Sequence, residues 1–174
     1  PPAAPAPEAP APTRQAFVAA AHPLAAEAGL DILRKGGSAV DAAVAIQAML
    51  SLVEPQSSGV GGGAFMVRYD AKPRAVTVYD GRETAPAGAT PGMFLGSDGK
   101  PLPFRTAVLS GRATGVPGVV RMLATAQQAH GKLAWKDLFT GAIDNAANGF
   151  TVTARAARFV NPSGPQAHPP HPHT

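Results

Sequence analysis

The sequence reads FMVRYDAKPRAVTVYDGR over residues 65–82. Both halves of this stretch are rich in β-branched and aromatic residues, and the polar, proline-containing segment 70–73 between them is typical of a turn. The pattern predicts a β-hairpin. Side chains alternate between the faces of a strand, so Val76, Val78 and Arg82 share one face if the extended geometry continues to the end of the stretch. We therefore expect Arg82 to point with the apolar residues, into the protein.

Arg82 is the candidate substrate-binding residue of this sequence. It lies in a short turn between two acidic residues, Asp80 and Glu83. A guanidinium held at the end of a strand can bind a carboxylate through two parallel hydrogen bonds. The residue types alone favour another interpretation, a structural ion pair between Arg82 and one of its acidic neighbours.

The composition predicts one central domain with two different ends. Residues 1–15 form a leader rich in proline and alanine, and residues 161–174 are rich in proline and histidine. Such segments have little to bury, so we expect both to be disordered, and we expect a disordered tail rather than a metal site at its histidines. The domain candidate is 16–160, a length suited to one hydrophobic core.

Charge and cysteine content exclude several classes of function. The net charge is +4 at pH 7, with basic residues scattered along the chain and no cysteine. Nucleic-acid binding is therefore not expected, and disulfides, thiolate metal sites and a cysteine nucleophile are ruled out. No stretch is long and apolar enough to predict a membrane span. We also expect no cofactor and no metal. The leader is compatible with an exported protein, and equally with a solubilising tail on a cytoplasmic one.

Two helices are predicted ahead of the hairpin. Pro23 opens the first, which ends at a glycine pair, 36–37. The second runs from Val40 to Val53 and is apolar nearly all round, which is typical of a helix buried in a large core. Ser38 is its predicted N-cap. After the hairpin we expect a loop over residues 92–103. Two further helices are predicted over 119–129 and 135–148, and a short helical piece over 151–159.

A glycine run, 59–63, precedes the hairpin. It fits a dinucleotide-binding pattern formally, but that pattern must follow a strand and open a helix, and here it follows a helix and opens a strand. Close approach of another chain segment or a ligand is the better interpretation. The serines Ser57, Ser58 and Ser110 lack a neighbouring acid–base pattern. We therefore assign no catalytic residue to this chain.

Five segments share one order with a known family. They read GGSAVDAAVA at 36–45, PQ at 55–56 with GGGAFM at 61–66, RETAP at 82–86 with MF at 93–94, GVPG at 115–118, and NGFTV at 148–152. Together they resemble the N-terminal part of the large subunit of the γ-glutamyltransferase (γ-glutamyltranspeptidase) family. The resemblance covers most of the domain candidate.

The resemblance implies an α/β (α+β) fold, a partial and truncated αββα sandwich of the N-terminal nucleophile hydrolases. It implies a precursor that cleaves itself into a large and a small subunit, whose new N-terminal threonine is the nucleophile. The γ-glutamyl group of glutathione or another γ-glutamyl amide passes to that threonine, then to water or to an amino-acid or peptide acceptor. Arg82 occupies the position that binds the substrate α-carboxylate. The family is typically periplasmic or secreted.

The same resemblance limits what this chain does alone. The threonine is absent, so we expect the chain to be inactive without its partners, the remaining large-subunit sequence and the small subunit. We expect residues 161–174 not to be family sequence, with a truncation or frameshift ending the frame. An uncovered apolar patch should result. Two alternatives stay open: a cephalosporin acylase-like amidase of the same family, and a non-catalytic remnant.

Overall fold

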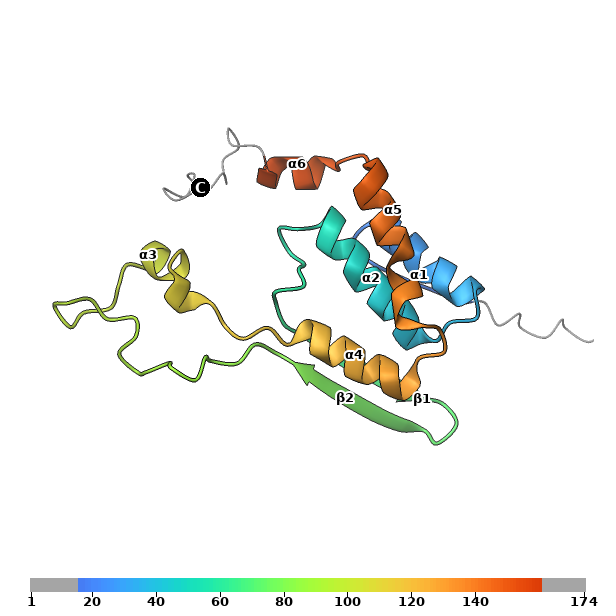
Figure 1. Cartoon of the computed structure of the whole chain (residues 1–174), viewed down its shortest axis with the longest axis horizontal. Helices are drawn as coiled ribbons and strands as arrows, with labels where there is room; N and C mark the ends of the chain where they lie inside the picture. Colours follow the sequence, from blue (N-terminus) through green and yellow to red (C-terminus); the bar gives the residue numbers. More distant parts are fainter. Residues whose placement is uncertain (1–15, 161–174) are drawn as a thin grey trace, which may run out of the picture.

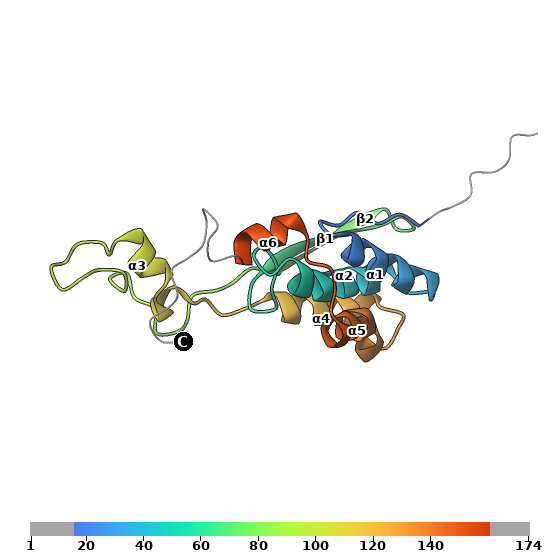
Figure 2. The same cartoon turned by 90° about the horizontal axis from the view of Figure 1, so that it is seen from above.

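The computed structural model describes residues 16–160. Most of its helices gather at one end of the molecule beside an antiparallel hairpin, and a long arm that carries α3 extends away from them in both views (Figure 1, Figure 2). The expectations for residues 1–15 and 161–174 lie outside the described residues. The elements in chain order are α1 Pro23–Arg34, α2 Ala39–Val53, β1 Ala64–Asp70, β2 Ala75–Gly81, α3 Phe104–Val108, the 3-10 helix η1 Gly111–Ala113, α4 Val119–His130, the 3-10 helix η2 Trp135–Phe139, α5 Thr140–Asn148 and α6 Ala154–Val160.

Helix α2 is the centre of the helical body. The side chain of Ser38 accepts a hydrogen bond from the backbone N–H of Asp41, and the Asp41 carboxylate accepts one from the N–H of Ser38 at 2.8 Å. This capping box starts the helix where the sequence predicts. No residue from 40 to 53 is exposed, because α1, α4, α5 and η2 all pack against α2. The prediction of a helix buried on nearly all sides is confirmed.

Helix α1 also has the predicted ends. The ring nitrogen Nδ1 of His22 accepts a hydrogen bond from the backbone N–H of Leu24 at 3.2 Å, and Pro23 occupies the first turn, where no N–H donor is needed. The helix stops two residues before Gly36, whose φ of +85° is the left-handed conformation that glycine adopts without strain.

Helix α4 joins the hairpin to the helical body. It contacts α2 on one side and both strands on another (Figure 1). At Gly81, a Cβ atom would lie 2.6 Å from the Cβ of Met122. The last residue of β2 must therefore lack a side chain for α4 to pack this close, and the hairpin face that carries Tyr79 and Gly81 is the inner face.

The predicted hairpin is confirmed, but the predicted direction of its faces is wrong. Val76 and Val78, expected to point inward, are 62% and 63% exposed. The side chain of Arg82 is also exposed, so it does not point into the protein as predicted. The physical reason is the approach of α4: it packs on the face where β2 presents glycine, and the β-branched residues are left on the other face.

An arm of the chain, residues 85–115, leaves the body after β2 and returns before α4. Thr84 and Val116 pair across its base, where the N–H of Val116 donates to the Thr84 carbonyl oxygen at 2.8 Å. The predicted loop over 92–103 is confirmed, while α3 and η1 follow it without a sequence signal. The single helix expected over 135–148 is divided into η2 and α5.

Candidate substrate-binding site

Arg82 lies one residue beyond β2, where the arm begins. Its backbone N–H donates to Oδ1 of Asp80 at 2.9 Å. Its Nε atom lies 3.4 Å from Oε2 of Glu83, with 71% of the arginine side chain exposed. The ion-pair alternative is thus present in the structure. An exposed pair of this kind contributes little free energy, so the guanidinium stays available to another carboxylate.

The glycine run brings a loop against Glu83. A Cβ at Gly63 would overlap the Glu83 carboxylate. The carbonyl oxygen of Gly62 accepts hydrogen bonds from the N–H groups of Gly118 and Val119, at 3.2 and 3.1 Å, where α4 begins. The predicted close approach of another chain segment to the glycine run is therefore confirmed. The glycine run packs against the carboxylate of Glu83, the residue next to Arg82.

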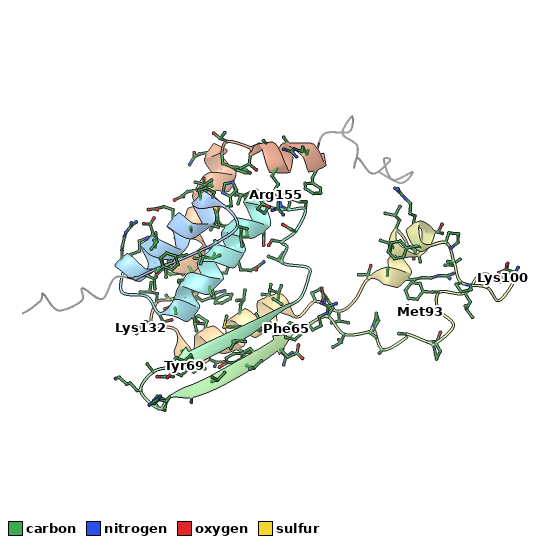
Figure 3. All side chains as sticks on the ribbon, turned by 180° about the vertical axis from the view of Figure 1, so that it is seen from behind. Phe65, Tyr69, Met93, Lys100, Lys132 and Arg155 are labelled. Atoms are coloured by element: carbon green, nitrogen blue, oxygen red, sulfur yellow. The ribbon has the colours of Figure 1, made fainter. Side chains whose placement is uncertain are left out.

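Two hollows flank Arg82. The larger, about 550 Å³, lies on the arm side and is lined by Arg82, Glu83 and Arg112 together with the apolar side chains of Met93 and Phe94. Figure 3 labels Met93 on the arm, well away from the helical body around α2. The walls thus combine two guanidinium groups, one carboxylate and an apolar surface, which suits a small ligand that carries negative charge.

The smaller hollow, about 380 Å³, lies on the α4 side of Arg82 and adds Asp80 and Arg121. Of the three arginines that line the two hollows, only Arg82 was predicted from the sequence; Arg112 and Arg121 were not. No local signal in the sequence marks Arg112. It lines the same hollow as Arg82 because the two ends of the arm pair, although the two arginines are thirty positions apart in the chain.

A buried carboxylate outside the site was also missed. Glu54 is 2% exposed, and it accepts a hydrogen bond from Nε2 of Gln56 at 2.6 Å. The Nε atom of Arg155, from α6, lies 3.3 Å from the same carboxylate (Figure 3). In the sequence Glu54 marks only the end of an apolar helix. Its partners show that it ties α6 to the end of α2, a structural role.

Two of the three hydroxyl groups considered as nucleophiles are engaged locally. Oγ of Ser110 donates to the Ala107 carbonyl oxygen at 2.7 Å, and Oγ of Ser57 lies within reach of the Glu54 carbonyl oxygen at 3.5 Å. Between residues 16 and 160 there is no group of three or more histidine, aspartate or glutamate side chains placed to hold a metal ion. In the same range, no helix has both the length and the apolar character that crossing a bilayer requires.

Comparison with known proteins decides the family. A family model described as Gamma-glutamyltranspeptidase matches residues 25–168, a range that ends inside the segment 161–174. The chain belongs to this family. The resemblance stated from the sequence motifs is therefore confirmed.

Curated members of the gamma-glutamyltranspeptidase family match over a long stretch. The glutathione hydrolase proenzyme of Bacillus subtilis (strain 168) is 48% identical over 148 residues, which is 85% of this chain and 25% of that protein. The glutathione hydrolase proenzyme of Escherichia coli (strain K12) is 36% identical over 158 residues, 91% of this chain and 27% of that protein. This chain thus spans about a quarter of the length of these relatives.

Solved structures agree on the fold. A gamma-glutamyltranspeptidase from Pseudomonas nitroreducens, complexed with L-DON, superposes with a TM-score of 0.78 at 38% identity, covering 84% of this chain and 43% of that one. A cephalosporin acylase from Bacillus halodurans gives a TM-score of 0.64 at 29% identity, covering 87% and 28%. The predicted fold class is confirmed: the described residues are an α+β fragment of the N-terminal nucleophile hydrolase fold.

Proposed function

We propose that this chain is the N-terminal part of the large subunit of an enzyme that cleaves γ-glutamyl amides such as glutathione. The γ-glutamyl group goes to water or to an amino-acid or peptide acceptor, through an N-terminal threonine that this chain does not contain. Membership of the family and the names of its curated relatives support the substrate class. Self-cleavage of a precursor and a periplasmic or secreted location belong to the same proposal.

Arg82 carries the proposal at the level of the site. Its guanidinium is exposed at the edge of a hollow, and among the described residues its one charged partner is Glu83, at a long contact distance. A planar, permanently charged fork in this position can bind the α-carboxylate of a γ-glutamyl substrate and direct the γ-carbonyl towards a nucleophile on another chain. The cost of weakening the exposed ion pair is small.

The uncovered side of the hairpin supports the proposed partners. Its outer face presents only apolar side chains over most of its length, each 59–70% exposed: Phe65, Val67, Tyr69, Val76 and Val78. An isolated two-stranded hairpin is marginally stable, and an apolar surface of this kind is normally covered. The remaining large-subunit sequence and the small subunit are the occupants that the proposed enzyme would supply.

A test of Arg82 uses the complete enzyme that contains this chain and the chromogenic donor γ-glutamyl-p-nitroanilide. Arg82→Gln removes the charge and Arg82→Lys keeps it but loses the fork, so we expect KM to rise at least about tenfold in the first and less in the second. Arg105→Gln, an exposed arginine of α3 on the same arm, is the matched control. An unchanged KM in Arg82→Gln would reject the assignment.

A second candidate within the family is an amidase resembling a cephalosporin acylase. The fold match to the cephalosporin acylase of Bacillus halodurans supports it. The complete enzyme separates the two candidates directly, because a γ-glutamyl transferase consumes glutathione and an acylase consumes a cephalosporin side-chain amide instead. A third possibility, a non-catalytic remnant, consumes neither.

A further inference from the structure

A second arginine faces the hollow that contains Arg82. Arg112 lies on η1, near the return of the arm, and its Nη1 atom donates to the Met93 carbonyl oxygen at 3.0 Å. This bond fixes one edge of the guanidinium against the arm. Five N–H donors are available on an arginine, so most of them remain free to bind a ligand in the hollow.

Among the described residues that line the larger hollow, the charges do not balance without a ligand. Arg82 and Glu83 form one neutral pair. The γ-glutamyl head group is neutral as well, because its α-carboxylate and α-ammonium carry opposite charges. Binding this group beside the Arg82–Glu83 pair therefore leaves the positive charge of Arg112 without a counter-charge. On the other side of Arg82, the smaller hollow contains Arg121 with the carboxylate of Asp80, and there the charges are matched.

We propose that Arg112 binds a second carboxylate, the one on the amino acid or peptide that is bonded to the γ-glutamyl group. This inference rests on the proposed function. The apolar side chains of Met93 and Phe94 line the same hollow, so a side chain between the two carboxylates has a surface to contact. The ligand class is a γ-glutamyl peptide or γ-glutamyl amino acid with a free C-terminal carboxylate.

Arg112 would then also bind the carboxylate of the acceptor. During transfer the amine of the acceptor attacks from the place that the leaving amine vacated, and so the acceptor carboxylate takes the position of the leaving-group carboxylate. Arg112 would therefore favour acceptors that are amino acids or peptides over simple amines and water. It is a specificity-determining residue and takes no part in the bond changes.

The test compares two donors that differ by one carboxylate. γ-Glutamyl-p-nitroanilide has none on its leaving group, and γ-glutamyl-3-carboxy-4-nitroanilide has one. In the complete enzyme we expect Arg112→Gln to lower the preference for the carboxylated donor, measured as the ratio of kcat/KM values, about tenfold. Arg112→Lys keeps the charge and should recover part of the preference. Arg121→Gln removes the same charge in the smaller hollow and should leave the ratio where it is.

Direct binding makes the outcome independent of turnover. Calorimetric affinities of γ-glutamylglycine and γ-glutamylmethylamide, measured for the same proteins with the nucleophile inactivated so that the ligands are not cleaved, give a second ratio, and Arg112→Gln should lower it by a similar factor. An unchanged ratio in Arg112→Gln, or a loss in Arg121→Gln instead, overturns the inference. Arg82→Gln should weaken both ligands equally. If the complete enzyme turns over neither donor, the proposed function fails, while the binding ratio still decides the role of Arg112.

Discussion

Asp41 ties the start of α2 to the end of α4. Its side chain is fully buried, and its carboxylate accepts hydrogen bonds from the N–H groups of Ser38 and Lys132, each at 2.8 Å, and from the Gln127 amide at 3.2 Å. Burial by itself raises the pKa of this carboxyl. The hydrogen bonds from Ser38, Lys132 and Gln127 stabilise the charged form more strongly, and the pKa of Asp41 is lowered.

Asp41→Asn should destabilise the chain by about 2–4 kcal/mol at pH 7. The substitution removes a buried charge that three hydrogen-bond donors share and turns an NH₂ group towards one of them. Urea unfolding measures the loss. Asp31→Asn is the control: Asp31 is 52% exposed, and its one ion-pair partner in the described part of the chain is Arg34, so its replacement should cost well under about 1 kcal/mol. Equal losses in the two variants would contradict the role given to Asp41.

The same residue makes stability depend on acid pH. The folded pKa of Asp41 lies below the unfolded value of about 3.9, so below that pH the unfolded chain binds more protons. The stabilisation is complete above about pH 5 and is lost progressively as the pH falls through the unfolded and then the lower, folded pKa. Asp41→Asn should reduce this slope. A residual slope is expected from Asp70, whose pKa is lowered by hydrogen bonds from Arg68 and the Lys72 N–H.

At the scale of elements, the hairpin is covered on one face only. Val67 and Val78 lie directly opposite each other on the outer face and are 70% and 63% exposed. Replacing both by threonine keeps the β-branched shape and strand preference while making the surface more polar. We expect the double variant to bind less of a hydrophobic dye and to self-associate less, with little change in Tm.

The matched control is Ile143→Thr, because Ile143 is 60% exposed but lies on α5. Dye emission and light scattering should fall in the hairpin variant and stay close to the parent in the control. If the parent chain, the double variant and the control gave the same dye signal, the outer face of the hairpin would not be the surface that binds the dye.

The elements that could be predicted are those set by neighbours in the sequence. Ser38 and Asp41 sit three residues apart and cap α2 in the expected way, and the apolar run that follows forms the most buried helix. Helix α3 was not predicted, because its five residues carry no N-cap hydrogen bond and none of them is buried. Its position depends on the arm that contains it.

At the scale of the whole molecule, we expect this chain alone to release no p-nitroaniline from γ-glutamyl-p-nitroanilide. The proposed nucleophile belongs to another part of the enzyme, and the chain spans about a quarter of the length of its curated relatives. Activity should appear when the remaining sequence is supplied. Turnover that scales with the concentration of the isolated chain, at a purity that excludes other hydrolases, would contradict this.

The sequence by itself determined the local structure and the family. Helix ends, the hairpin and the position of Arg82 at a strand end follow from interactions within a few residues, and the ordered motifs span most of the domain. The tertiary structure decided which hairpin face is buried, because that depends on where Gly81 lets α4 approach. It also decided the distant partners of Asp41, which lie 86 and 91 residues away, and it placed Arg112 in the hollow that Arg82 also lines. Contacts of that separation depend on how the elements pack, which no short stretch of sequence specifies.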